Sequence, residues 1–353
     1  MCRTKTTTAQ DVAARAMDPT FERLMDGYKN LLKVVSVRDL ILSSPDKSLP
    51  LEHLDNLSQK LHLNKGSLHF IRKYPHIFSF SKPLLNLTDA AIEIHRRESA
   101  AIEATAPAVI DRLVRLLSMA TATAHSVPLR AVIRIRRELG LPDDFERTII
   151  SRNPDFFTLR DNPRERNTHI LILNPNPSCF NFTPAVETWR EMEFAFKNGY
   201  PPGMRVNRGF RAKVKAWQRL PYPGPYEAGR RSRAGIGWME KRAVGIVHEF
   251  LNLTVEKMVE VEKVSHFREC FGIQMNMRDL FLDHPGIFYL STKGNVHTVF
   301  LREAYEKGCL IEPNPVYEAR RELLRLVIMG QRGFPNGNAE SSCEGVPMEF
   351  VAD

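Results

Sequence analysis

Positively charged and aromatic side chains alternate over residues 200–242, a combination suited to contact with an unpaired nucleic-acid strand. Guanidinium groups bind phosphate oxygens in pairs, and flat rings can stack on unpaired bases. Residues 197–242 hold 12 Lys and Arg against the two acids Glu227 and Glu240, a net charge of +10 in a chain whose total is +9. The positive excess of the whole chain is concentrated here, which predicts a polyanionic partner.

The candidate contact residues lie in this segment and in one later turn. The alternative interpretation is a solvated basic loop whose tryptophans pack inward. Pro221, Pro223 and Pro225 predict an extended passage, because proline does not fit within a helix. The run Arg230–Arg233 also fits a linker or a nuclear-localisation patch. The candidate residues are Arg205, Arg208, Arg211, Lys213, Lys215, Trp217, Arg219, Tyr222, Arg230, Arg231, Arg233, Lys241, Arg242 and Lys293.

Motifs of enzymes are absent from the sequence. His248 and Glu249 begin an H-E-x-x-H zinc motif, but its fifth position is Asn252, so the second zinc ligand is missing. Glycine-rich phosphate loops are not found. The 5 cysteines are scattered without a C-x-x-C pair, and no local sequence places a thiol beside a histidine base. We predict no catalytic site, no metal and no cofactor.

The elements that carry these residues are predicted by a proline-then-phenylalanine pattern that occurs three times, at Tyr74–Phe80, Asn153–Leu159 and His284–Leu290. The proline stops a helix, and the aromatic and β-branched residues that follow favour a strand. Two apolar helical stripes precede each copy. A second strand follows in the last two copies; in the first it is short or missing. The phenylalanines three residues after each proline are predicted core residues: Phe78, Phe157 and Phe288.

The predicted fold class is mainly α with small β-hairpins. Three helix-turn-helix-plus-hairpin units, winged-helix-like, are expected at about 51–87, 127–174 and 263–302, joined by longer helices. Prolines start several of these longer helices, at Pro19 after the cap Asp18, at Pro107 and at Pro184. Another is predicted at 316–329.

The ends of the chain and its compartment follow from composition. Residues 1–16 are interpreted as the remnant of a transit peptide or as a disordered end, and residues 331–353 as a disordered tail. The chain has no apolar run long enough to span a membrane, and we expect no secretory signal because no apolar stretch lies near residue 1. Its scattered cysteines favour a reducing compartment.

Five segments together resemble the plant organelle RNA recognition (PORR) family, and the resemblance covers about residues 17–330. The last two segments are long and specific. The stretch Asn174–Trp189 departs from the family pattern. The five segments are Met17–Glu22, Arg72–Phe80, Arg205–Glu227, Glu240–Lys257 and His284–Ile311.

The resemblance implies a non-enzymatic RNA-binding protein that assists splicing of group II introns by binding and shaping intron RNA. We expect it in the mitochondrion, with the chloroplast as the alternative. The expected partners are organelle RNA and other splicing factors, with no membrane and no small-molecule substrate. A DNA-binding transcription or termination factor of organelles, and a non-catalytic interaction scaffold, remain as alternative functions. Helices do not fit the deep groove of A-form RNA, so contacts by loops such as the turn at Lys293 are expected.

Overall fold

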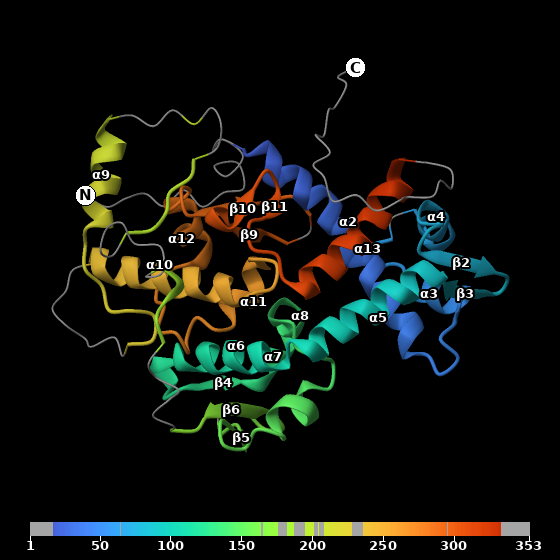
Figure 1. Cartoon of the computed structure of the whole chain (residues 1–353), viewed down its shortest axis with the longest axis horizontal. Helices are drawn as coiled ribbons and strands as arrows, with labels where there is room; N and C mark the ends of the chain where they lie inside the picture. Colours follow the sequence, from blue (N-terminus) through green and yellow to red (C-terminus); the bar gives the residue numbers. More distant parts are fainter. Residues whose placement is uncertain are drawn as a thin grey trace. The chain divides into compact units, whose positions relative to one another are not determined.

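The computed structural model describes residues 17–63, 65–163, 165–175, 182–186, 195–200, 204, 208–227, 236–294 and 296–332. The fold is mainly helical and contains several small antiparallel sheets (Figure 1). The chain divides into two compact units, each considered by itself. One contains residues up to 32 and 92–324, and the other contains residues 33–91 and those from 325 onward. Within the described residues, no helix has the length and apolar character needed to cross a membrane.

Three antiparallel sheets have the same strand order, in which the last strand in the chain lies in the centre. The smaller unit has β1 (Leu49–Pro50), β2 (Phe78–Ser81) and β3 (Leu84–Leu87) in the order β1-β3-β2. The larger unit has β4 (Ser126–Pro128), β5 (Phe157–Asp161) and β6 (His169–Leu173) in the order β4-β6-β5. It also has β7 (Met258–Glu260), β8 (Phe288–Ser291) and β9 (Thr298–Leu301) in the order β7-β9-β8, and a pair β10 (Tyr305–Glu306) and β11 (Cys309–Leu310).

Short helices lie between the first and second strands of each sheet. They are α3 (Leu51–Leu57) and α4 (Ser67–Lys73), then α7 (Leu129–Arg134), α8 (Arg136–Leu139) and a π-helical turn (Glu146–Ile150), then α11 (Val261–Ser265) and α12 (Met277–Asp283). Helix α4 ends two residues before Pro75 and α12 ends two residues before Pro285. The strand then begins at the predicted phenylalanine in all three cases. The proline-then-phenylalanine pattern therefore marks the change from helix to strand, as predicted.

The structure corrects several details of these segments. The short first strand of each sheet was not predicted. The second strand of the first hairpin, expected to be short or missing, is the four-residue β3. The first of the two apolar stripes before the second copy, over 129–138, forms two helices, α7 and α8, separated at Ile135, and not one. Helix α11 ends at Ser265. The first apolar stripe before the third copy, formed by Phe267, Cys270 and Phe271, therefore lies in the turns that follow α11 and not in a helix.

Longer helices complete the two units. They are α2 (Pro19–Ser43), α5 (Asp89–Ala104), α6 (Ala106–Ser118), α9 (Arg208–Gln218), α10 (Ile236–Leu253) and α13 (Pro315–Arg332). The predicted helices near Pro19, Pro107 and 316–329 are confirmed, and Asp18 caps α2 by accepting a hydrogen bond from the Thr20 amide. Most of the helix predicted after Pro184 lies outside the described residues, as do both chain ends.

The core of the larger unit is a continuous apolar cluster centred on α10. Helix α6 lies between α10 and the β4-β6-β5 sheet (Figure 1). Along α10 every residue from Lys241 to Leu251 is buried, as expected for a central helix that is apolar on most sides. Phe157 and Phe288 lie in this cluster, and Phe78 is buried in the smaller unit, so all three predicted core phenylalanines are confirmed.

We predict that Phe288→Ala lowers the free energy of unfolding by about 3–5 kcal/mol, because it leaves a cavity beside Phe281, whose ring lies 5.3 Å away. Chemical denaturation of the full chain, followed by circular dichroism, measures the change. Ile133→Ala is the matched control, since Ile133 is 39% exposed and its truncation should cost less than about 1 kcal/mol. Equal losses in the two variants would contradict the assignment of Phe288 to the core.

Candidate nucleic-acid interface

Among the described residues of the basic segment, residues 197–242, helix α9 carries the densest group of exposed cations. It contains no proline, and Val214 is its only β-branched residue. It ends at Gln218, three residues before Pro221. This helix was not predicted from the sequence, although its composition and the spacing of its charges could have revealed it. The exposed cations are Arg208, Arg211, Lys213 and Lys215, with Arg219 directly after the helix.

Three of these cations lie on one face of α9. Arg208, Arg211 and Lys215 are spaced i, i+3 and i+7, which aligns side chains along a helix. At about 1.5 Å per residue they extend over roughly 10 Å of the helix axis. We call Arg208, Arg211 and Lys215 the α9 ridge. A row of positive side chains of this length can contact successive phosphates of an extended strand.

The cations of α9 are not neutralised by the protein in the part of the chain that the structure describes, where no carboxylate forms an ion pair with any of them. Other exposed cations of the protein are paired with carboxylates. Lys29 lies 2.7 Å from Asp26, and Arg96 lies 2.8 Å from Glu93. The positive charge of α9 is therefore available to an external anion.

The opposite face of α9 packs on aromatic rings. The Phe210 ring lies 6.0 Å from the Tyr200 ring in an edge-to-face arrangement. The Trp217 ring lies 5.8 Å from Phe196 and 4.5 Å from His284. Such contacts contribute about 0.5–1.5 kcal/mol each beyond the burial of area. The helix is therefore divided into a charged outer face and an aromatic inner face.

A fully buried lysine holds the end of this helix. Lys241, in the first turns of α10, donates to the Gln218 carbonyl at 2.7 Å and to the Leu220 carbonyl at 2.6 Å. Its Nζ also lies 5.2 Å from the centre of the Trp217 ring and 5.5 Å from that of Tyr222. Burial lowers the pKa of Lys241 to about 8. The last carbonyls of a helix lack partners within the helix, and Lys241 supplies one.

Two glycines allow the neighbouring segments to approach. At Gly286, an added Cβ would lie 2.6 Å from Asn198 Oδ1 and 3.0 Å from the Tyr200 ring. The Gly199 amide donates to the Gly286 carbonyl at 2.8 Å, which joins the 195–200 segment to the turn before β8. At Gly245, an added Cβ would lie 2.6 Å from the Tyr222 ring. A side chain at either position would force apart the segments that support α9.

The remaining predicted contact residues lie in other environments. Tyr222, Lys241 and Arg242 are buried, so an external strand cannot reach them in this structure. Arg242 donates to the Phe271 and Glu227 carbonyls and to Thr121 Oγ1. Trp217 is partly buried, with its ring against protein groups. Lys293 Nζ lies 2.6 Å from Asp26. Arg205, Arg230, Arg231 and Arg233 fall outside the described residues.

The residues that resembled a zinc motif form structural contacts. The buried Glu249 carboxylate accepts from Tyr226 Oη at 2.5 Å and from the Ala185 amide at 2.7 Å. His248 Nε2 lies 2.6 Å from Glu303. The described residues contain no group of three or more His, Cys, Asp or Glu side chains able to hold a metal.

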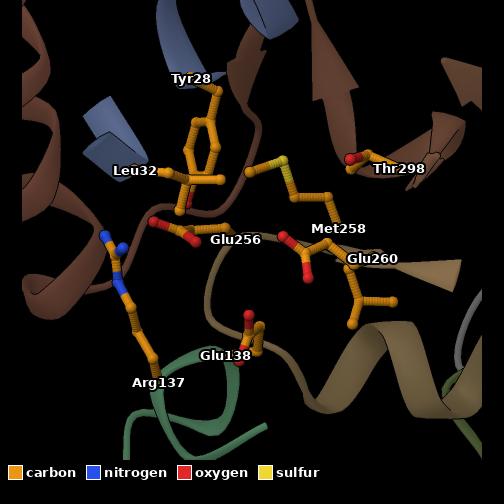
Figure 2. Close-up of a pocket in the computed structure, with 9 residues that line it drawn as sticks. Tyr28, Leu32, Arg137, Glu138, Glu256, Met258, Glu260 and Thr298 are labelled. Atoms are coloured by element: carbon orange, nitrogen blue, oxygen red, sulfur yellow. The ribbon is translucent and has the colours of Figure 1, made fainter. Parts of the chain in front are cut away.

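A small pocket in the larger unit lies between α2, α8 and β7, with Tyr28, Arg137, Glu138 and Glu256 around it (Figure 2). Its cavity volume of about 20 Å³ suits a single water molecule. Burial by itself lowers the pKa of Arg137, but the interactions with Tyr28 and Glu256 raise it by more, so the pKa lies above its ordinary value. The pocket is therefore part of a charged interior and is too small for a nucleotide.

Comparison with known proteins assigns the chain to a family. Residues 16–332 match the plant organelle RNA recognition domain. The chain is 36% identical to Protein ROOT PRIMORDIUM DEFECTIVE 1 of Arabidopsis thaliana, over 93% of this chain and 86% of that protein. No solved structure shows a significant match.

Two further relatives carry the name of an organelle. The chain is 27% identical to the chloroplastic WHAT'S THIS FACTOR 1 homolog of Oryza sativa subsp. japonica, over 98% of this chain and 74% of that protein. It is 28% identical to the mitochondrial WHAT'S THIS FACTOR 9 of Arabidopsis thaliana, over 88% of this chain and 83% of that protein. A match that extends from residue 16 to residue 332 shows that the chain belongs to the plant organelle RNA recognition (PORR) family, whose members recognise RNA and are not enzymes.

Proposed function

We propose that this protein binds organelle RNA through the cations of α9 and Arg219, and that it assists splicing of group II introns by holding the intron in a productive shape. The observation that carries the proposal is the exposed α9 ridge, which no carboxylate of the described residues neutralises. The protein supplies no reacting group, because the intron RNA itself is the catalyst.

The contacts made by α9 should be to phosphates. Phosphate contacts fix the position of a strand without reading its sequence, whereas base recognition needs rings or polar groups that reach the base edges. The aromatic side chains of α9, Phe210 and Trp217, and Tyr222 after its end pack against other rings of the protein. Sequence preference would then come from other parts of the protein.

The three sheet-containing segments support an interpretation as winged-helix-like units. Each has one short strand, two or three short helical segments and a hairpin, in that order. In this interpretation the hairpin loops are the wings. Arg166, in the loop of the second hairpin, is exposed and is the better candidate for RNA contact, because Lys293 in the third is paired with Asp26.

The compartment we propose is the mitochondrion, with the chloroplast as the alternative. It is supported by the similarity to relatives that include the mitochondrial WHAT'S THIS FACTOR 9, and the similarity to chloroplastic relatives supports the alternative. Import of the labelled protein into isolated plant mitochondria and chloroplasts tests this assignment. Protection from added protease in chloroplasts alone would favour the alternative.

We predict that replacing the α9 ridge by R208A/R211A/K215A weakens binding to single-stranded RNA and reduces the slope of log affinity against log salt by about 2, since each lost phosphate contact contributes about 0.7. Fluorescence anisotropy over a range of salt concentrations measures both quantities. K29A/R96A/R97A is the matched control, because it removes the same charge from cations that are already ion-paired. An unchanged salt slope in the ridge variant would favour the interaction scaffold.

Competition with duplex DNA separates the two nucleic-acid functions. We expect unlabelled single-stranded RNA to displace a labelled RNA at a lower concentration than duplex DNA does at the same salt, because a flexible strand can follow the α9 ridge. Stronger competition by duplex DNA would support a transcription or termination factor.

Lys241 should affect RNA binding although it is buried. We predict that Lys241→Met removes about 2 kcal/mol of local stability from the end of α9, because two charge-assisted hydrogen bonds are lost. Faster amide exchange over residues 208–220 and weaker RNA binding should follow, and Lys241→Arg should restore part of both. Binding and exchange that stay at wild-type levels in Lys241→Met would show that α9 is held by its aromatic contacts alone.

The splicing role is tested by crosslinking the protein to organelle RNA and sequencing the recovered fragments. Enrichment of group II intron sequences is expected. Recovery of exonic or ribosomal sequences alone would leave RNA binding in place and reject the proposed role in splicing.

A further inference from the structure

The smaller unit contains a stretch of sequence without acids. Residues 56–88, from the last turn of α3 to just past β3, include no aspartate and no glutamate, although the whole chain has 41 acids in 353 residues. The absence of acids is therefore a local feature of this segment. Its lysines and arginines are Lys60, Lys65, Arg72, Lys73 and Lys82.

Helix α4 is divided into a buried side and a charged side. Its buried residues Ser67, Phe70 and Ile71 are spaced i, i+3 and i+4, which places them on one side of the helix. His69 and Arg72 lie three residues apart at positions outside this set, and both are exposed. The outer side of α4 therefore presents polar and positive groups to solvent.

The turn before α4 adds two exposed lysines, Lys60 and Lys65. Its backbone is fixed by hydrogen bonds from the Leu63 amide to the Ser58 carbonyl and from the Gly66 amide to the Leu63 carbonyl, both at 2.9 Å. Lys65 directly precedes Gly66, the residue at which α4 is capped.

We call Lys60, Lys65 and Arg72 the α4 face. Lys65 lies just before α4 and Arg72 lies in its last turn, so the charge extends along the whole helix. At about 1.5 Å per residue this distance is roughly 10 Å, similar to the length of the α9 ridge.

The α4 face is not neutralised by the protein within the part of the smaller unit that the structure describes. There, no carboxylate forms an ion pair with Lys60, Lys65 or Arg72. Arg38 of the same unit is different, because its Nη2 lies 3.0 Å from Asp39 Oδ1. The charge of the α4 face is therefore available to an external anion.

The other two sheet-containing segments provide an internal comparison. In the second segment, Asp143, Asp144 and Glu146 lie at the places that correspond to the turn before α4 and the start of α4. In the third, α12 itself contains Asp279 and Asp283. The shared fold thus tolerates acids at these places, so it does not require a surface without them. A positive surface confined to the first segment is typical of a site for a polyanion.

The aromatic rings of this part of the smaller unit are used inside it. The Phe70 ring lies 5.1 Å from the Tyr74 ring and 6.0 Å from the Phe78 ring, and all three side chains are buried. They cannot stack on bases from this position. Contacts of the α4 face should therefore be to phosphates, which position a strand without reading its sequence.

We propose that the α4 face is a second contact surface for RNA phosphates. The Arg72 guanidinium can donate two hydrogen bonds to one phosphate, and the ammonium groups of Lys60 and Lys65 add positive charge beside it. The proposal rests on the RNA-binding function proposed above and adds a surface that belongs to the other compact unit of the chain.

The first test is fluorescence anisotropy of the full chain with a labelled single-stranded RNA over a range of salt concentrations. We expect K60A/K65A/R72A to reduce the slope of log affinity against log salt by about 2, since each lost phosphate contact contributes about 0.7. K29A/R96A/R97A removes the same charge and should match the wild-type chain. Combining K60A/K65A/R72A with R208A/R211A/K215A should reduce the slope by about 4, because the two surfaces contact different phosphates.

A second measurement uses the wild-type chain, so it does not depend on the folding of a variant. Lysines are acetylated with an N-hydroxysuccinimide ester in the presence and absence of saturating RNA, and the modified positions are quantified by mass spectrometry. Lys60 and Lys65 should become less reactive when RNA is bound. Lys47, an exposed lysine of the same unit outside the α4 face, should react equally in both samples.

The outcomes separate the α4 face from the proposed function. A wild-type salt slope in K60A/K65A/R72A, or unchanged acetylation of both Lys60 and Lys65, overturns the α4 face. The proposed function then still stands if R208A/R211A/K215A binds RNA more weakly than the wild-type chain. A wild-type chain that binds no RNA overturns the proposed function itself.

Discussion

The contact between Lys241 and the end of α9 is the interaction on which the cationic surface depends. Helix α9 has 11 residues, a length at which isolated helices are marginal in water. Its own charges oppose folding, because Arg208, Arg211 and Lys215 are like-charged neighbours on one face and no acid lies among them. The inner contacts of Trp217 and the two hydrogen bonds from Lys241 must therefore supply the stability that the charge pattern removes.

Carboxylates are used differently in the rest of the larger unit. The buried pairs Arg302–Asp18 and Arg320–Glu98, at 2.8 Å and 2.7 Å, join segments that are distant in sequence. Buried pairs of this kind add little net stability, but they are costly to break and so favour one arrangement of the chain. Buried carboxylates pair with Arg302 and Arg320, whereas α9 contains no acid. The arginines of the interior therefore differ from those of α9 in their partners, although the residue type is the same.

Much of the fold could be predicted from local signals. The prolines that end helices, the phenylalanines that begin strands and the proline-started helices are all consequences of backbone geometry within a few residues. The strands β1 and β4 were missed because each is only two or three residues long and includes a proline. Each also pairs with a strand more than 30 residues away, so no local signal indicates the pairing. Likewise, nothing near Lys241 in the sequence indicates that it is buried, whereas Arg211 and Lys215 are exposed. That difference arises from the packing of α10 against α9. The packing leaves some cations of the basic segment accessible to an external strand and buries others.

The aromatic inner face of α9 has a consequence for the speed of encounter. With its rings turned inward, the helix presents charge alone to an approaching strand, and such a field acts over about 8 Å at physiological ionic strength. Long-range attraction without base recognition allows capture at many positions, followed by one-dimensional diffusion along the strand. Capture would therefore be fast and indiscriminate, and the residence time at a particular position would be decided by groups elsewhere on the protein.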